Sequence, residues 1–174
     1  MEVSLRLLES SDLELLLAWA HVKRIWEYLP TSRKGEYLTW EDHYKWWVSR
    51  ENREDWMIRV DGRSVGTIII HLKSGEIGIY IGEVSLWGKG VGYKSLKLGV
   101  ARMIALGFEV IWAAIHPENI ASVKLFTGMM FKKVGKARRG VDRYELDLRT
   151  TVRPEGSIRE FKIGDRLGSP ASAL

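Results

Sequence analysis

The sequence predicts an α/β protein of the α+β kind, in which a mixed sheet is flanked by helices. Three observations predict this class. Two apolar runs between 56 and 70 are joined by Asp61-Gly62, a hairpin signal. Residues 76–81 alternate as expected for a half-buried strand. The glycine-rich turn at 88–92 leads into apolar residues at helical spacing, as expected for an amphipathic helix.

The remaining elements follow in order along the chain. Ser11 to Glu14 form a capping box for a first helix. Thr39 opens a second helix, whose predicted apolar face is Trp40, Tyr44, Trp47 and Val48. The apolar run 110–115 predicts a strand covered on both faces. The other expected elements are strands at 5–8, 132–135 and 143–148 and helices after Gly92 and at 119–127.

Length and composition limit the protein class. The 174 residues suffice for one domain, which we expect over 1–149, followed by a tail at 150–174 with at most one added strand at 158–163. With 45% hydrophobic and 28% charged residues, the chain can bury a core. No apolar run approaches the length of a membrane span. Residues 1–6 have no basic or apolar region typical of a secretion signal, so we expect a cytoplasmic protein.

Charge and cysteine usage narrow the chemistry. The chain has no cysteine, which excludes disulfides, thiolate nucleophiles and Cys-ligated metals. Its four histidines show no metal-ligand spacing, so no metal site is expected. A formal charge of +5 suits an anionic partner. Part of the excess lies in one stretch, which is either a solvated connection or an anion-binding patch: Lys132, Lys133, Lys136, Arg138, Arg139 and Arg143, with Asp142.

The turn at 88–92 is the clearest candidate for a ligand site. Gly88, Gly90 and Gly92 let the backbone approach a ligand closely. The free N–H groups of the following helix favour a phosphate, and Lys89, Lys94 and Lys97 add positive charge. A tight turn without a ligand is the alternative. No P-loop is present, and Ser95 stands where a dinucleotide fingerprint has its third glycine.

Two segments resemble motifs of a known family. Residues 80–92, ending in Trp87-Gly88-Lys89-Gly90-Val91-Gly92, resemble motif A of the GNAT superfamily of acyl-CoA-dependent N-acetyltransferases. Residues 119–126 and 131–135 resemble motif B and the strand after it. The resemblance implies a mostly antiparallel sheet of six to seven strands, splayed between strands 4 and 5. The branch most resembled acetylates ribosomal-protein N-termini, and spermidine and amino-sugar acetyltransferases share its pattern.

The resemblance also implies a cofactor site for acetyl-CoA. The pyrophosphate would bind the backbone of the turn, and the pantetheine would pair with the end of strand 76–81. Asn119 would bond the pantetheine arm, and Ser122 would face the thioester sulfur. The implied cofactor-binding residues are Ile79, Ile81, Gly88, Lys89, Gly90, Val91, Gly92, Tyr93, Asn119, Ser122 and Phe126.

Three positions depart from the family pattern. Trp87 stands where the motif usually begins with Arg or Gln, and Met130 replaces a usual glycine. Phe126 stands where many relatives have the tyrosine that protonates the leaving thiolate. This leaves Ser122 or water as the candidate acid.

Glu76 is the leading candidate for the general base, because strand alternation places it on one face with Tyr80, near the implied splay. A surface glutamate in a cross-strand pair is the alternative reading. His116 ends the strand 110–115 and either relays a proton or caps the chain. His21, His43 and His71 are interpreted as structural or exposed.

The implied reaction is direct attack of a neutral amine on the acetyl thioester. A protein or peptide N-terminal amine is favoured as acceptor, with an amino sugar or another small amine as the alternative. Trp26, Tyr28, Trp40 and Tyr80 are candidates for the acceptor pocket or for plain core. Two further classes stay open: a non-catalytic acyl-CoA binder, and a nucleic-acid binder that uses residues 132–143. We expect a monomer or a homodimer with no membrane contact.

Overall fold

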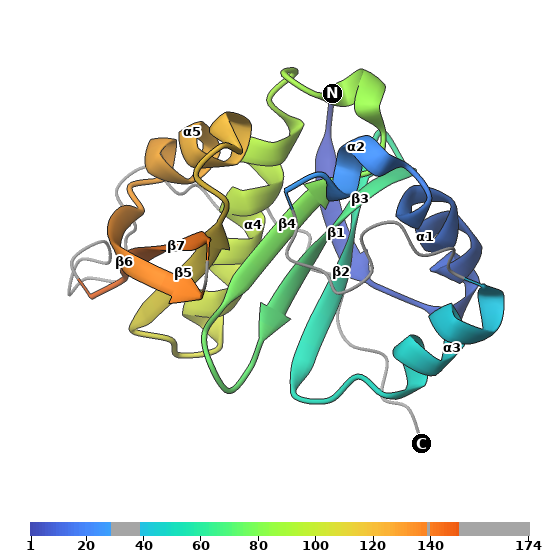
Figure 1. The fold of residues 1–174 in the computed structure, drawn as a ribbon, viewed down its shortest axis with the longest axis horizontal. Coiled ribbons are helices and arrows are strands. Elements are labelled where there is room, and N and C mark those ends of the chain that lie inside the picture. Colours follow the sequence, from blue (N-terminus) through green and yellow to red (C-terminus); the bar gives the residue numbers. More distant parts are fainter. Residues whose placement is uncertain (29–38, 139, 150–174) are drawn as a thin grey trace.

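The computed structural model describes residues 1–28, 39–138 and 140–149 as seven strands and five α-helices (Figure 1). The expected tail and its strand at 158–163 lie outside the described residues. The strands are β1 Val3–Leu7, β2 Arg53–Val60, β3 Arg63–His71, β4 Ile77–Ile81, β5 Val110–Ile115, β6 Lys132–Arg138 and β7 Val141–Asp147. The helices are α1 Leu13–Ala20, α2 Lys23–Trp26, α3 Trp40–Val48, α4 Val91–Ala105 and α5 Ile120–Gly128.

The strands form two antiparallel sheets that meet at one point. One sheet has the order β1-β2-β3-β4 and the other the order β5-β7-β6. An isolated parallel bridge joins Glu76, just before β4, to Trp112 on β5, and the N–H of Trp112 donates to the carbonyl oxygen of Gly75 at 3.0 Å. Among the described residues no ladder continues from this bridge. The expected mixed sheet with its splay between strands 4 and 5 is therefore confirmed.

Two cores hold helices on opposite faces of the four-stranded sheet. The larger core lies under α4, where Leu96, Val100 and Met103 are fully buried. Here α4 approaches the sheet closely, because a Cβ on Gly99 would lie 3.0 Å from the side chains of Ile68 and Ile77. The smaller core joins Met57 of β2 to residues of α1 and α2, namely Leu13, Leu16, Trp19 and Ile25.

The first helix begins differently from the prediction. The capping box predicted at Ser11 to Glu14 is wrong: the reciprocal pair is Glu9 with Asp12, around a short 3₁₀ turn. The Asp12 carboxylate accepts from the backbone N–H of Glu9 at 2.9 Å and is held by the Arg6 guanidinium at 2.6 Å. Because Arg6 on β1 fixes this carboxylate, the capping box begins at Glu9, two residues before the predicted Ser11.

The second predicted cap is confirmed, but of the predicted buried face of its helix only Trp47 packs on a core. Thr39 and Asp42 form a reciprocal capping box at the start of α3. Trp40, Tyr44 and Val48 are 47%, 49% and 60% exposed. The buried residue of α3 is instead His43, and Trp46 and Trp47 pack on the smaller core.

The strand expected to be covered on both faces, β5, is covered on one. Ile111, Ala113 and Ile115 are buried under the helices, whereas Trp112 and Ala114 are only half-buried. The Arg143 guanidinium covers the Trp112 ring at 4.2 Å, so this face of β5 carries a charge rather than a helix. No helix in the described part of the chain is long and apolar enough to span a bilayer.

Candidate active site

The glycine turn forms an open anion site at the start of α4. Gly88 and Gly90 have φ values of +73° and +79°, a region that favours glycine. A Cβ at either position would meet no described atom within 4 Å, so the space above the turn is open there. The first helical hydrogen bond runs from the N–H of Lys94 to the carbonyl oxygen of Gly90 at 3.1 Å. The N–H groups of Val91, Gly92 and Tyr93 precede it and are available to a ligand.

The lysines near this turn are not equivalent. Lys89 is exposed within the turn itself. The Lys94 ammonium donates to the carbonyl oxygen of Met1 at 3.2 Å, so it ties the N-terminus to α4. Gly92 faces α5, because a Cβ there would lie in ordinary van der Waals contact with Leu125, at 3.5 Å. The positive helix end and Lys89 therefore supply the charge at the turn.

The free edge of β4 begins beside the bridge to β5. The backbone groups of the even-numbered residues point toward β3, as shown by the bonds from Gly82 N–H to Val65 O at 2.8 Å and from His71 N–H to Glu76 O at 2.9 Å. In an antiparallel ladder the backbone groups of Ile79 and Ile81 then point the other way, past the divergence from β5. An extended ligand with amide groups can add to this edge.

Trp87 closes one end of that edge. Its indole N–H donates to the carbonyl oxygen of Ile81 at 2.8 Å, and the Arg24 guanidinium lies over its ring at 5.0 Å. Trp87 stands where the family motif usually has Arg or Gln, and its indole N–H makes this hydrogen bond within the fold. The N–H of Ile81 and both backbone groups of Ile79 are not used by this bond, and they point toward the gap where β4 and β5 diverge.

The α5 helix lies beside the start of α4, where Leu125 faces Gly92. The Asn119 side chain caps this helix, because its Oδ1 accepts from the N–H of Ser122 at 3.1 Å. This bond leaves the amide NH₂ of Asn119 to donate elsewhere. Ser122 is half-buried in the first turn. The cap therefore fixes both residues relative to one another.

A family model described as the acetyltransferase (GNAT) domain matches residues 2–132. The chain belongs to the GNAT acetyltransferase family. An uncharacterized protein of Methanocaldococcus jannaschii is 38% identical over 154 residues, which cover 84% of this chain and 31% of that protein. The chain thus spans about a third of that relative's length. A crystal structure of a domain from M. jannaschii matches with 39% identity and a TM-score of 0.77, over 84% of this chain and 98% of that one.

More distant GNAT structures share the fold. The aminoglycoside acetyltransferase AAC(6')-Ib, solved in complex with coenzyme A, is 18% identical with a TM-score of 0.72, over 85% of this chain and 96% of that one. Spermidine N-acetyltransferase from Vibrio cholerae, solved with CoA and spermine, is 16% identical with a TM-score of 0.71, over 83% and 95%. At these identities the likeness concerns the fold.

On the other face of this GNAT sheet, opposite α4, a charged row crosses the strands. The register places Arg53 of β2 opposite His71 of β3, whose N–H bonds to Glu76. The Glu76 carboxylate, 19% exposed, lies 3.5 Å from the Arg138 guanidinium of β6. Arg53 and Arg50 both bond to the nearly buried carboxylate of Asp55. Burial, followed by the charge of Arg53, lowers the pKa of His71.

Aromatic side chains cover the next part of that face. The Tyr80 ring meets those of Trp26 and Trp19 with centroids 5.3 and 6.0 Å apart. Burial raises the pKa of Tyr80 above its usual range, so its phenol stays neutral. Tyr28 lies against His116 at 5.6 Å. His116 Nδ1 accepts from the N–H of Glu118 at 3.3 Å, a capping contact.

Two predicted site residues lie elsewhere. Phe126 is 3% exposed in the larger core, where its ring packs edge-on against Phe131 at 5.0 Å. Trp40 lies on the exposed face of α3, and no ring contact within the described residues joins it to Tyr80. The predicted cofactor residues thus lie on the turn, on β4 and on α5. Tyr80, with Trp26 against its ring, and Glu76 lie on the face of the sheet opposite α4.

Sequence reasoning missed His71 and Arg138, which flank Glu76. For His71 a signal existed, since antiparallel pairing across the short connection 72–75 places it opposite Glu76. For Arg138 the signal was hidden. The ladder of β6 and β7 shifts register between Lys136 and Arg138, which pairs Arg138 with Val141 and turns it to the face of Glu76.

Proposed function

We propose that this protein transfers the acetyl group of acetyl-CoA to a primary amine. The observation that carries the proposal is the open glycine turn at the start of α4, which lies next to an edge of β4 that no other described strand covers beyond the bridge to β5. The turn offers backbone donors to a pyrophosphate. The edge offers main-chain groups to the amides of a pantetheine arm. A ligand that has both parts is coenzyme A, with which the distant GNAT relatives were crystallised.

Each cofactor contact can be named by residue. The N–H groups of Val91, Gly92 and Tyr93 hold the pyrophosphate, and Lys89 adds charge. Ile79 and Ile81 pair with the pantetheine, and the NH₂ of Asn119 bonds its amide. A backbone N–H near Ile81 polarises the thioester carbonyl. Ser122, fixed by the Asn119 cap, faces the sulfur.

The acceptor amine then attacks the acetyl carbonyl directly. Its carbon–nitrogen bond forms while the carbon–sulfur bond breaks, and no covalent enzyme intermediate is required of a chain without cysteine. Before the attack, Glu76 takes a proton from the acceptor ammonium, directly or through water, and so generates the neutral amine. The thiolate receives a proton from Ser122 or from water. Phe126 takes no part, because its ring lies in the core.

The acceptor approaches from the face that carries Glu76 and Tyr80, away from α4. A peptide N-terminal amine is the favoured acceptor, with small-molecule amines as the second candidates. The aromatic contacts of Tyr28 and Tyr80 support this placement. Trp40 is left out, since it lies on the exposed face of α3.

A nucleic-acid function has less support from the structure than from the sequence. Lys133 and Lys136 both pair with the buried carboxylate of Asp142, at 2.6 and 2.5 Å. Arg143 pairs with Glu145 at 2.7 Å, and Arg138 with Glu76. Much of the basic stretch is therefore neutralised within the fold.

Calorimetric titration with acetyl-CoA tests the cofactor site. The purified protein is expected to bind with micromolar affinity, about 8 kcal/mol. Gly90→Glu places a carboxylate in the turn and is expected to abolish binding. Ala105→Glu is the matched control, because it adds the same charge to an exposed position at the other end of α4 and leaves binding intact.

Turnover across an amine panel, followed by release of free CoA, tests transfer. Acetylation of any amine, lost in Gly90→Glu and kept in Ala105→Glu, supports the proposal. Binding of acetyl-CoA without turnover on any amine would identify a non-catalytic acyl-CoA binder. No binding at millimolar acetyl-CoA would overturn the proposed function altogether.

A further inference from the structure

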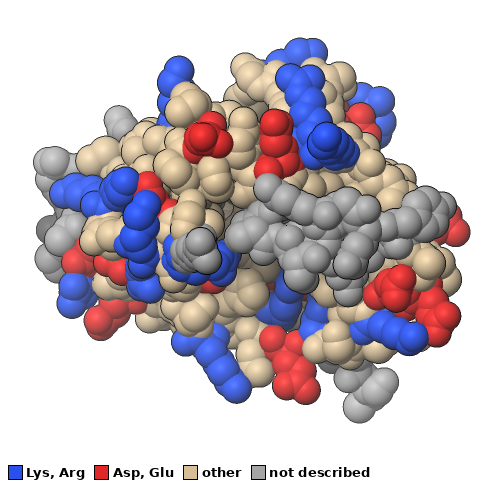
Figure 2. All heavy atoms as spheres, in the orientation of Figure 1, with Lys and Arg blue, Asp and Glu red and all other residues tan. Residues whose placement is uncertain are grey.

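The acceptor-side face carries a set of arginine–carboxylate pairs at the sheet junction. Glu76 is paired with Arg138, and Glu145 with Arg143, which also stacks on Trp112. Asp55 is shared by Arg50 and Arg53. The three carboxylates of this set are each paired with at least one arginine, and the set has four arginines, so its net charge is positive. Figure 2 shows Lys and Arg gathered on this side of the molecule, over the three-stranded sheet, with acidic residues between them.

We propose that the acceptor carries a negative charge close to its reacting amine, and that Arg138 and Arg143 bind this charge. The inference rests on the proposed function, whose acceptor class it names. A polycationic acceptor would have to break one arginine–carboxylate pair for each ammonium it places here. An anionic acceptor needs only guanidinium N–H groups that are still free to donate.

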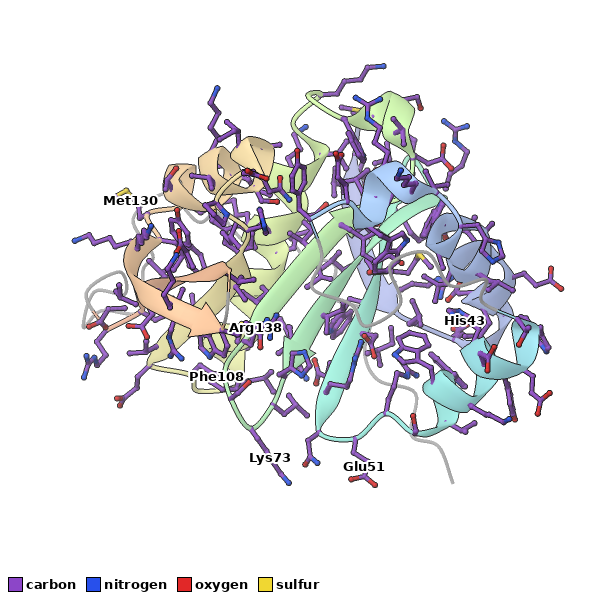
Figure 3. All side chains as sticks on the ribbon, viewed as in Figure 1. His43, Glu51, Lys73, Phe108, Met130 and Arg138 are labelled. Carbon is purple, nitrogen blue, oxygen red and sulfur yellow. The ribbon has the colours of Figure 1, made fainter. Side chains whose placement is uncertain are left out.

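Arg138 has the geometry for this role. Its closest approach to Glu76 is 3.5 Å, longer than the roughly 2.7–2.9 Å of a strong charged hydrogen bond. Its side chain is 48% exposed. Within the described residues this is its only ion pair. Figure 3 shows Arg138 at the end of β6, on the side of β4.

Arg143 offers a second set of donors on the same face. Only its Nε bonds to Glu145 among the described residues, and its side chain is 35% exposed. The two terminal nitrogens of the guanidinium remain to bind a carboxylate or phosphate in the bidentate manner that arginine favours. Stacking on Trp112 fixes the plane of the group.

Binding and proton transfer are coupled in this arrangement. An acid group of the acceptor that engages Arg138 draws this arginine away from Glu76. The Glu76 carboxylate is then free to take the proton of the neighbouring ammonium. Arg138 therefore acts as a positioning residue. An anionic acceptor is expected to have a higher kcat and a lower KM than a neutral one.

Matched peptides test the charge preference. Three tripeptide amides with a free N-terminus, Ala-Glu-Ala, Ala-Gln-Ala and Ala-Lys-Ala, differ only in the central charge. We expect kcat/KM to be about tenfold higher for the glutamate peptide than for the glutamine peptide, equivalent to one strong charge contact, and lowest for the lysine peptide. Glucosamine 6-phosphate against glucosamine distinguishes a phosphorylated sugar from an acidic peptide as the source of the charge.

Arg138→Glu is expected to reverse the order of kcat/KM among the three peptides. Arg138→Gln is expected to make the three kcat/KM values similar. Arg149→Gln removes the same charge from an exposed site beyond β7 and is expected to leave the order unchanged. In the unmodified protein the coupling is expected to give the glutamate peptide a higher kcat than the glutamine peptide. Arg138→Gln is expected to remove this difference by raising kcat for the glutamine peptide, because Glu76 then has no arginine to release. Equal kcat values for the two peptides in the unmodified protein would overturn the coupling to Glu76.

Calorimetry measures peptide binding in parallel. If the protein binds CoA, this titration is made with the protein saturated with CoA. If no amine is acetylated, the proposed function fails, while tighter binding of the glutamate peptide, lost in Arg138→Glu, still supports the anion site. If amines are acetylated without regard to charge, or with spermidine preferred, the proposed function stands and this inference is overturned. Equal binding of the glutamate and lysine peptides overturns it in either case.

Discussion

The indole N–H of Trp87 donates to the carbonyl oxygen of Ile81 at 2.8 Å, and so ties the glycine turn to the last residue of β4. The two residues come from the two halves of the proposed cofactor site: Ile81 lies on the strand edge, and Trp87 directly precedes Gly88. The bond fixes the spacing between this edge and the glycine turn. Because the ring is 37% exposed, water can replace this bond, so its effect falls on geometry more than on stability.

Trp87→Phe is expected to weaken acetyl-CoA binding about threefold to tenfold, because the substitution keeps the ring but removes a hydrogen bond worth roughly 0.5–1.5 kcal/mol. The free energy of unfolding should change by less than about 1 kcal/mol. Calorimetric titration and urea denaturation measure the two quantities. Unchanged or tighter binding would show that the bond does not organise the cofactor site.

Gly82→Ala is expected to destabilise the protein more than Gly88→Ala. A Cβ on Gly82 would lie 2.1 Å from the ring of Trp19, which is 4% exposed, so the ring has to move. Overpacking of this kind costs about 3 kcal/mol. At Gly88 the space is open and only the positive φ opposes a side chain, at about 1–2 kcal/mol. Urea denaturation of both variants compares the costs.

A double-mutant cycle isolates the contact with Trp19. In a Trp19→Ala background, the cost of Gly82→Ala should fall markedly, because the clashing ring is gone. The cost of Gly88→Ala should be the same in both backgrounds. An equal cost of Gly82→Ala with and without the ring would contradict the packing argument.

Much of the cofactor side could be predicted from the sequence because its signals are local. Strand alternation predicts β4, and the three glycines followed by a helical pattern predict the start of α4. Asn119 caps α5, three residues before Ser122, within a single turn. Such features depend on the backbone of one short segment, so a single sequence contains them.

The acceptor side could be predicted only in part, because it depends on packing between distant segments. The exposed face of α3 carries Trp40 and Tyr44, which hydrophobicity alone assigns to a core. Arg138 reaches Glu76 through a register shift that no local pattern reports. Without that shift, alternation would place Arg138 on the opposite face, with Lys136 and Asp142.

Phe126→Tyr is expected to destabilise the protein without raising kcat. The substitution restores the residue that many relatives have, but the ring is 3% exposed and packs against Phe131. A hydroxyl buried there without a partner costs about 1–3 kcal/mol. Urea denaturation and steady-state turnover check the two effects. An increase in kcat with unchanged stability would show that the hydroxyl reaches the thiolate, and would contradict the exclusion of Phe126 from the chemistry.

Stability is expected to fall as the pH drops through the ordinary pKa of histidine, partly because of His71. Burial, followed by the charge of Arg53, lowers the pKa of His71 in the folded state, so between the folded and unfolded values the unfolded chain binds the proton more readily. Stability from the neutral ring is thus present above the unfolded value of about 6.5 and is lost as the pH falls toward the folded one.

His71→Gln removes this contribution, and urea denaturation at pH 7.5 and 5.5 measures it. The variant is expected to lose less stability than the unmodified protein over this interval, because its side chain does not titrate. His116→Gln is the control, since His116 is also half-buried but lies at the end of β5 rather than opposite Glu76. An equal loss in His71→Gln and the unmodified protein would contradict a neutral His71 in the folded state. A neutral His71 places no charge beside Glu76, whose ion pair among the described residues is then with Arg138 alone.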